Sequence, residues 1–88
     1  MEITYSPKAL DDIEKIKKSG LNSHKQRLER IIKSILENPY EGFGNPEQLK
    51  HEFTGKWSRE LSKKDRVLYM VENDDIFILS ILGHYTDK

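Results

Sequence analysis

RVLYMVENDDIFILSILGHY, residues 66–85, consists of two runs of strand-forming residues separated by the acidic turn 73–75. The odd-numbered positions of both runs are apolar, whereas the even-numbered positions are mixed. Successive side chains of a strand point to opposite faces, so this pattern predicts an antiparallel hairpin of strands 66–72 and 76–85. The face expected to pack on the rest of the protein carries Val67, Tyr69, Val71, Phe77, Leu79 and Ile81.

The register of this hairpin places two chemically useful side chains near each other. For the apolar residues of both strands to share a face, the numbers of paired residues must have an even sum. A three-residue loop over 73–75 sets Arg66 opposite Leu82. His84 is then the diagonal neighbour of Arg66, roughly 7 Å away. We therefore expect a guanidinium and an imidazole at one open edge of the sheet, on the face away from the helices.

Two helices are predicted before the sheet. Residues 2–5, EITY, alternate like a short strand, and Ser6-Pro7 is a typical helix start. Gly20 is expected to end this first helix, and Asn22 or Ser23 to cap the second. Asn38-Pro39 should stop the second helix. Its buried stripe is predicted from apolar residues at helical spacing: Leu28, Ile31, Ile32, Ile35 and Leu36.

The middle of the chain changes from helical to strand periodicity. Residues 39–46 contain two glycines and two prolines and are expected to form a loop. Strands are predicted over 48–53 and 56–61, with a turn at Thr54-Gly55. The order predicts an α+β fold in one domain, residues 1–88: a strand, a two-helix hairpin, then four strands of a twisted antiparallel sheet, β-α-α-β-β-β-β.

Composition excludes several classes of protein. The 88 residues include no cysteine, which rules out disulfides and cysteine-bound metal, and no apolar run is long enough to span a membrane. A soluble cytoplasmic protein is expected. The formal net charge is zero, but residues 48–66 contain six basic and three acidic residues. This basic stretch is either an ordinary solvated face or a phosphate-binding surface.

Three residues form a candidate catalytic set. Arg66 can bind phosphate with two parallel hydrogen bonds, and His84 can exchange a proton near neutral pH. Glu47, which follows the glycine-containing loop, can supply a carboxylate. Such a set is suited to cleaving RNA without a metal, because it can take a proton from the 2′-hydroxyl, stabilise the phosphorane and protonate the leaving oxygen. The alternative is that Arg66 pairs with a nearby carboxylate and that His84 merely ends a strand.

Other side chains give weaker signals. The three histidines, at positions 24, 51 and 84, lack the spacing of metal ligands, so neither a metal nor another cofactor is expected. Trp57 can either stack on a base or pack within the protein.

The segment EGFGNPEQLKHEFTGKWSREL, followed by RVLYMV and a strand closing in HY, resembles the YoeB/Txe toxins of bacterial type II toxin–antitoxin systems, in the RelE superfamily. Their pattern is roughly EGxGxPExLKxxxxGxWSRR, then RLVY, then a terminal HY. The match is dense over residues 41–85. The first 40 residues match in layout and in Asp11-Asp12.

The resemblance implies a ribosome-dependent mRNA endonuclease that cuts message in the ribosomal A site. Metal-independent cleavage would leave a 2′,3′-cyclic phosphate and a 5′-hydroxyl. The family's general base falls on Glu47, its phosphate-stabilising arginine on Arg66 and its general acid on His84. Further positions resemble residues that contact RNA or the ribosome or support the site: Lys50, Arg59 and Tyr85.

This chain departs from the family pattern at three places. Glu60 replaces a second arginine after WSR, which removes a positive charge near the substrate and adds a negative one. Asn45 replaces the lysine of GKPE. The chain also continues beyond HY through residues 86–88, which puts in doubt a role that needs a terminal tyrosine carboxylate.

The resemblance also implies partners. A cognate antitoxin of the YefM/Axe type would neutralise the chain, and operator DNA would be bound only through the toxin–antitoxin complex. The ribosome and mRNA would be its targets, no membrane is involved, and a homodimer remains open. Two other functions remain as alternatives: a toxin of the same fold that binds its target without cutting RNA, and an inactive homologue that binds only antitoxin and DNA.

Overall fold

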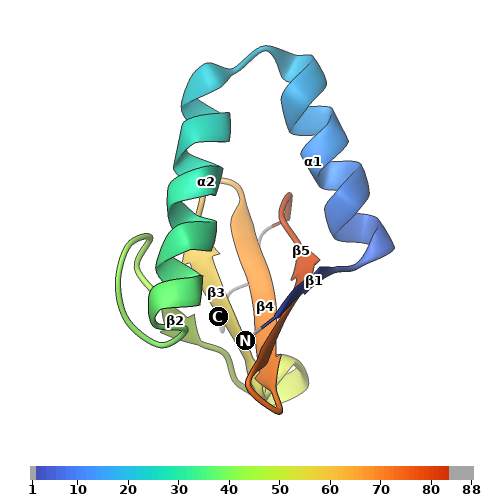
Figure 1. The fold of residues 1–88 in the computed structure, drawn as a ribbon. Coiled ribbons are helices and arrows are strands. Elements are labelled where there is room, and N and C mark those ends of the chain that lie inside the picture. The colour runs from blue at the N-terminus through green and yellow to red at the C-terminus, as the bar shows by residue number, and fades with distance from the viewer. Residues whose placement is uncertain (1, 84–88) are drawn as a thin grey trace.

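The computed structural model describes residues 2–83 and confirms the α+β fold class and the order of elements. Both helices lie on the same side of the sheet and are joined by a short link at the top of Figure 1. The elements in chain order are β1 (Ile3–Tyr5), α1 (Pro7–Ser19), α2 (Asn22–Glu37), β2 (Glu47–Gln48), a 3₁₀ turn η1 (His51–Phe53), β3 (Lys56–Glu60), β4 (Arg66–Glu72) and β5 (Asp75–Ser80).

The helix boundaries follow local chemistry. Ser6 caps α1, because its Oγ accepts a hydrogen bond from the Ala9 N–H at 3.0 Å. Gly20 ends α1 in the left-handed conformation, with φ of 73°. The predicted cap of α2 is wrong: Leu21 is the N-cap residue and makes no side-chain cap hydrogen bond. The predicted stop of α2 at Asn38 is confirmed.

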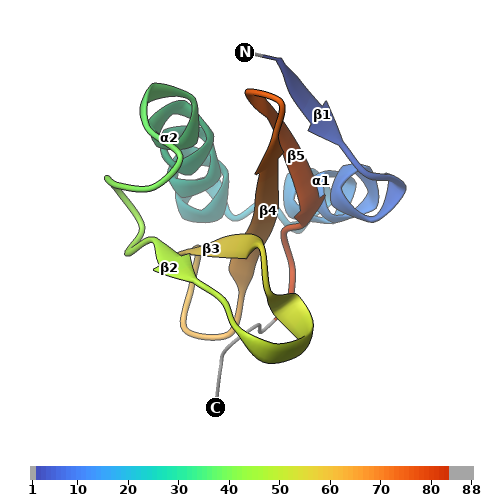
Figure 2. The ribbon, with the colours of Figure 1, turned by 90° about the horizontal axis from the view of Figure 1, so that it is seen from below.

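The sheet has five strands in the order β1-β5-β4-β3-β2. Strands β2 to β5 pair antiparallel, as expected. β1 pairs parallel with β5, with Ile3 opposite Ile76 and Tyr5 opposite Ile78, so the whole sheet is mixed. From below, both helices lie on the same side of β4 and β5, and β2 and β3 extend the sheet past them (Figure 2).

The core fills the space between the helices and this covered face of the sheet. Its buried members come from both helices, from β4 and β5, and from the segments after β3 and after β5. The buried residues are Ala9, Ile16, Leu28, Ile31, Ile35, Leu61, Val67, Tyr69, Ile76, Ile78 and Ile81.

The predicted register of the last hairpin is correct at one end only. The turn has two central residues, Asn73 and Asp74, rather than three, and Glu72 pairs with Asp75. Asn73 and Asp74 have positive φ, 53° and 67°, as in tight hairpin turns. Asparagine and aspartate tolerate this conformation better than most residues. The shorter turn puts Ile76 and Ile78 on the covered face, so the prediction for Phe77 and Leu79 is wrong.

A register shift between Leu68 and Tyr69 restores the predicted register at the start of β4. Leu68 lies opposite Ser80, as a three-residue loop would have placed it. β5 ends at Ser80 rather than continuing to 85, so Arg66 and Leu82 form no ladder pair. Instead, the Arg66 backbone N–H donates to the Gly83 carbonyl at 2.7 Å.

The predicted strand over 48–53 is also wrong. β2 is only two residues long, and the chain then turns through η1. His51 has φ of 56°, which no regular strand accommodates, and the Thr54 hydroxyl donates to the His51 carbonyl at 2.6 Å.

Candidate functional site

Arg66 lies at the centre of the candidate site. It is the first residue of β4, and its side chain is only 8% exposed. Its Nε donates to the Ser58 hydroxyl at 2.9 Å and its Nη2 to the Asn45 carbonyl at 3.2 Å. These two hydrogen bonds hold the guanidinium plane in one orientation before any ligand is present.

Two carboxylates flank this guanidinium. Glu47 Oε2 lies 3.4 Å from Arg66 Nη2, and Glu60 Oε2 lies 3.9 Å from Arg66 Nη1. The structure thus brings Glu47 and Arg66 together, as the sequence predicted, and also forms the alternative pair with Glu60. Both glutamates are about half in solvent, with 40% and 46% of their side chains exposed. Water therefore screens both ion pairs, and each contributes little to stability.

Strand pairing explains this cluster. Glu47 lies opposite Ser58 in β2–β3, and Glu60 lies opposite Arg66 in β3–β4. Residues directly opposite share a face of the sheet, and Ser58 and Glu60 are two apart on one strand. Val67, next to Arg66, belongs to the core under the helices. The cluster therefore lies on the sheet face away from the helices, as predicted.

The segment after β5 is fastened beside Arg66. The Gly83 N–H donates to Asp65 Oδ1 at 3.0 Å, while the Gly83 carbonyl accepts the Arg66 N–H. The predicted site residues His84 and Tyr85 lie outside the described residues. His84 follows Gly83 directly in the chain, so the point from which it departs is held against the backbone of Arg66.

Asp12 of α1 also holds the segment after β5. Its carboxylate is fully buried, and Oδ2 accepts the N–H groups of Ile81 at 2.9 Å and Leu82 at 3.0 Å. Burial alone would raise the pKa of Asp12, but the hydrogen bond from Leu82, the Lys8 ammonium and the Ile81 N–H together hold the pKa below its usual value. Sequence reasoning assigned Asp12 no role. The available signal is its position, three residues after Ala9 and four before Ile16 on the buried stripe of the helix.

Arg59 does not have the surroundings of an RNA contact. It is fully buried in β3 and lies opposite Val67, on the helix-covered face. Its guanidinium donates to backbone carbonyls of the loop after α2 and to two hydroxyl groups. Of the two roles expected for Arg59, RNA contact and support of the site, this burial favours support. Lys50, by contrast, is exposed and follows β2 closely.

Trp57 packs against the protein. It is half-buried, adjoins the core, and its ring centroid lies 5.1 Å from that of Tyr40. These contacts favour the packing role over a free stacking platform.

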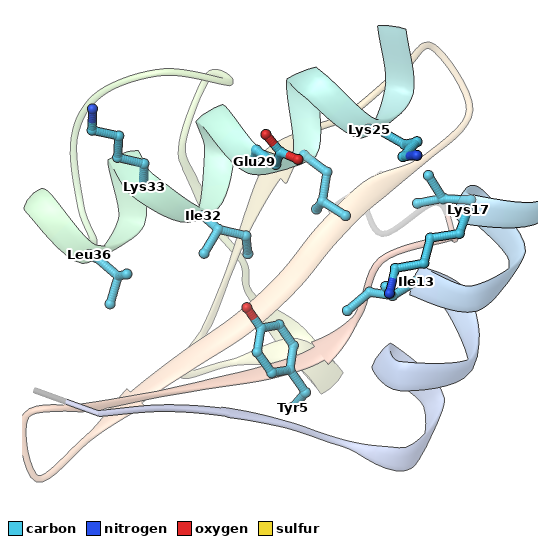
Figure 3. A pocket seen from close by; sticks show the side chains of 10 residues that line it. Tyr5, Ile13, Lys17, Lys25, Glu29, Ile32, Lys33 and Leu36 are labelled. Carbon is cyan, nitrogen blue, oxygen red and sulfur yellow. The ribbon is translucent and has the colours of Figure 1, made fainter. Parts of the chain in front are cut away.

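A separate cavity of about 440 Å³ opens between α1, α2 and β1 (Figure 3). Its wall is largely apolar, and Lys17, Lys25 and Lys33 stand with Glu29 around it. Because it lies on the helix side of the sheet, this cavity is not part of the Arg66 cluster. Within residues 2–83, no three histidine, aspartate or glutamate side chains are grouped to hold a metal ion. None of the described helices is long and apolar enough to cross a membrane.

Comparison with known proteins matches the chain to a family of toxins. The model of the YoeB-like toxin of bacterial type II toxin–antitoxin systems matches residues 5–85. The chain belongs to this YoeB-like toxin family.

Individual YoeB toxins agree with this assignment. Toxin YoeB of Escherichia coli O6:H1 is 38% identical over 60 residues, which cover 68% of this chain and 71% of the relative. Toxin YoeB of Streptomyces coelicolor is 32% identical over 85 residues, covering 97% of this chain and all of the relative. In a Staphylococcus aureus YoeB–YefM heterotetramer, one chain is 34% identical, with a TM-score of 0.84 and coverage of 97% and 98%.

Structural similarity extends to other toxins of the same fold. A YoeB/ParE toxin from Agrobacterium tumefaciens superposes with a TM-score of 0.88 at 24% identity, over 97% of this chain and all of the other. At this identity the similarity shows the fold alone. The YoeB-like fold therefore rests on sequence and structure together.

Proposed function

We propose that this YoeB-like chain is a ribosome-dependent endoribonuclease that cleaves mRNA in the ribosomal A site and so inhibits translation. The observation that carries this proposal is the approach of Glu47 Oε2 to Arg66 Nη2, 3.4 Å, on the open face of the sheet. The proposed base and the proposed phosphate-binding cation are adjacent there, and the carboxylate is 40% exposed. The fastening of Gly83 to Arg66 supports the addition of His84 to the same site.

The chemistry requires two proton transfers and one charge to be stabilised. Glu47 takes the proton of the 2′-hydroxyl, whose oxygen attacks the adjacent phosphorus. Arg66 stabilises the additional negative charge on the phosphorane oxygens. His84 donates a proton to the 5′-oxygen as the P–O bond breaks. The products are a 2′,3′-cyclic phosphate and a 5′-hydroxyl, and the three side chains supply every proton without a metal.

We propose that a substrate phosphate takes the place of the Glu47 carboxylate beside Arg66 when RNA binds. In the free protein the carboxylate, 40% exposed, lies beside a guanidinium that is only 8% exposed. Ser58 and Asn45 accept hydrogen bonds from Arg66 Nε and Nη2. The scissile phosphate is therefore proposed to approach the Nη1 and Nη2 end of the guanidinium, where the two carboxylates lie. Lys50, exposed near β2, is proposed to bind the backbone of the message.

The proposed regulator is an antitoxin of the YefM type, as in the Staphylococcus aureus complex. The cavity between α1, α2 and β1 suits apolar side chains of such a partner, and its lysines suit neighbouring acidic ones. Operator DNA would be bound through the antitoxin. A homodimer is a further proposal, supported by a Staphylococcus aureus YoeB dimer of the same fold, with TM-score 0.85. The cytoplasm, where ribosomes lie, is the proposed site of action.

The second candidate function is binding without cleavage. It is favoured by Glu60, which places a negative charge within 3.9 Å of Arg66, where a phosphate would lie. Single-turnover incubation with purified ribosomes that carry mRNA in the A site separates the two functions. The nuclease yields 5′ fragments that end in a cyclic phosphate. A wild-type protein that binds these ribosomes and leaves the message intact would establish the binding function instead.

A further inference from the structure

A single buried side chain fastens the loop between α2 and β2. Arg59, fully buried in β3, spreads its guanidinium under this loop, residues 38–46. Two nitrogens reach three loop carbonyls, and the remaining contacts are hydroxyl groups of α2 and β4. The distances are 2.7 Å from Nη1 to Phe43 O, 2.8 Å from Nη2 to Asn38 O, 3.2 Å from Nη2 to Glu41 O, 2.9 Å from Nη1 to Ser34 Oγ and 3.0 Å from Nε to Tyr69 Oη.

Tyr69 completes the fastening. Its hydroxyl accepts from Arg59 Nε and donates to the Pro39 carbonyl at 2.5 Å. Burial raises the pKa of Tyr69, so the phenol keeps the proton that it donates. These five hydrogen-bond acceptors of Arg59 are carbonyl and hydroxyl oxygens, so its buried charge is spread over neutral atoms. Loss of any one of them would leave a charged group without its hydrogen bond, and such a loss is costly.

The loop fits so closely that it has little freedom of its own. Gly42 has φ of 123°, and a Cβ there would lie 2.4 Å from Ser34 Oγ. Gly44 has φ of 91°, and a Cβ there would lie 3.3 Å from Arg59 Cβ. Only glycine is compatible with such close approach at positive φ. The loop therefore runs along Arg59 in a defined path.

This path ends at the candidate site. The Gly44 carbonyl accepts the Glu60 N–H at 2.6 Å, and the Asn45 carbonyl accepts Arg66 Nη2 at 3.2 Å. Two residues later the chain reaches Glu47. Glu47 itself begins β2, which has two residues, and just beyond it the Leu49 N–H donates to the Lys56 carbonyl at 3.0 Å. So short a strand is a weak anchor, and the fastened loop adds a second constraint on the side before Glu47.

We propose that Arg59, together with Tyr69, is a positioning residue that sets where Glu47 meets Arg66. This inference rests on the proposed function, because it assigns Arg59 a role in the reaction without any contact to RNA. A purely structural Arg59 would affect folding stability alone. A positioning Arg59 affects the chemical step in protein that remains folded, since a displacement of about 1 Å can slow a reaction about 100-fold.

The side chain of Trp57 reports on the loop independently of activity. It is the only tryptophan of the chain, and the Tyr40 ring, carried by the loop, lies 5.1 Å from it. Tyr69→Phe is the main variant, because it keeps the buried ring and removes the hydroxyl that joins Arg59 to Pro39. Arg59→Lys is the stronger variant, which keeps the charge and loses the fork of donors.

The matched control is Tyr40→Leu. It removes the ring beside Trp57 and leaves the backbone carbonyls that Arg59 binds, so it calibrates the emission change and should keep the wild-type cleavage rate. In Tyr69→Phe we expect altered Trp57 emission, faster amide exchange at residues 42–47, and a single-turnover rate about 10- to 100-fold lower. The ribosome concentration at half-maximal rate should stay within about threefold, since binding groups are unchanged.

The result that overturns the inference is a folded Tyr69→Phe protein that cleaves at the wild-type rate, whether or not its emission changes. If the wild-type protein itself leaves ribosome-bound message intact, the proposed function fails. The role of Arg59 in positioning Glu47 is still tested in that case. It is overturned if Trp57 emission and amide exchange at residues 42–47 in Tyr69→Phe equal those of wild type. It is supported when both change while the rest of the sheet keeps its protection.

Discussion

Glu60 and Arg66 lie directly opposite each other in β3 and β4, with Glu60 Oε2 3.9 Å from Arg66 Nη1. Glu60 is also linked to α2, since its carbonyl accepts two hydrogen bonds from Arg27 and its carboxylate lies 3.8 Å from Arg27 Nη2. The glutamate therefore stays near the guanidinium that would bind phosphate. In the proposed function, its negative charge would oppose the approach of a phosphate group.

The first prediction concerns this charge. Glu60→Arg should strengthen ribosome binding, because it removes one repulsion and adds one possible phosphate contact. We expect affinity to rise by about 3- to 10-fold, the size of an exposed charge effect of about 1 kcal/mol. The slope of log affinity against log salt should steepen by about one. Glu60→Gln, which only removes the charge, should give a smaller rise and no steeper slope. Equal affinity in all three proteins would show that Glu60 does not meet the RNA.

The second prediction concerns the buried carboxylate of Asp12. Its pKa is lowered in the folded protein, so it contributes stability above the ordinary aspartate pKa and loses that contribution as pH falls through the folded value. Asp12→Asn should therefore cost about 1–3 kcal/mol at pH 7, because Ile81 and Leu82 lose a charged acceptor. In urea unfolding at decreasing pH, the difference between variant and wild type should shrink.

The control for Asp12 is its neighbour Asp11. Asp11 is 63% exposed and pairs with Lys15 at 3.2 Å on the outer face of α1. Asp11→Asn should change the free energy of unfolding by less than about 0.5 kcal/mol at any pH. A pH-independent cost for Asp12→Asn would show that lost packing, rather than the charge, accounts for it.

The third prediction concerns the hairpin turn. Asp74 has φ of 67°, a conformation that glycine adopts without steric cost. The Asn-Gly pair is favoured in a two-residue turn of this kind, so Asp74→Gly should raise stability by up to about 1 kcal/mol. Asp74→Val should lower it, because a β-branched residue is strained at positive φ. Thermal melts of both variants test the turn, and a stable valine variant would contradict the two-residue geometry.

The fourth prediction concerns the cavity between the helices. Leu36 lines it and is 40% exposed. Leu36→Glu should weaken binding of a YefM-type antitoxin by about 10-fold or more, because a charge would enter an apolar contact. Cleavage by the free toxin should be unchanged, since the cavity and the Arg66 cluster lie on opposite faces of the sheet. Calorimetric titration with the antitoxin measures the first effect. An unchanged affinity would place the antitoxin elsewhere on the toxin.

Hydrophobic periodicity predicted the order of elements because each stripe or alternation is a local signal. The register failed near the turn because sequence did not reveal that Asn73 and Asp74 would both adopt positive φ. Residue types and the family resemblance placed Glu47 and Arg66 in one site, whereas the burial of Arg59 was not anticipated. A basic residue within a basic stretch has the pattern of a solvated one. The burial of Arg59 depends on hydrogen bonds to carbonyls of residues 38–43, which are distant in sequence, so local pattern does not predict it.

The last prediction divides the reaction among Glu47, Arg66 and His84. Glu47→Ala and His84→Gln should each slow single-turnover cleavage on ribosomes by about 10²–10⁴-fold, the usual contribution of a general base or acid. Arg66→Ala should slow it at least as much, and Arg66→Lys should recover only part, because a point charge does not replace the bidentate fork. Double variants should lose less than the product of the single effects if the three act as a unit. Substitution of the half-exposed Glu47 should cost the protein less than about 1 kcal/mol of stability. Substitution of Arg66 should cost more, because its side chain makes buried hydrogen bonds. Thermal melts must therefore accompany every rate. A His84→Gln protein that melts like wild type and cleaves at the wild-type rate would show that His84 is not the general acid. Another group would then have to protonate the 5′-oxygen.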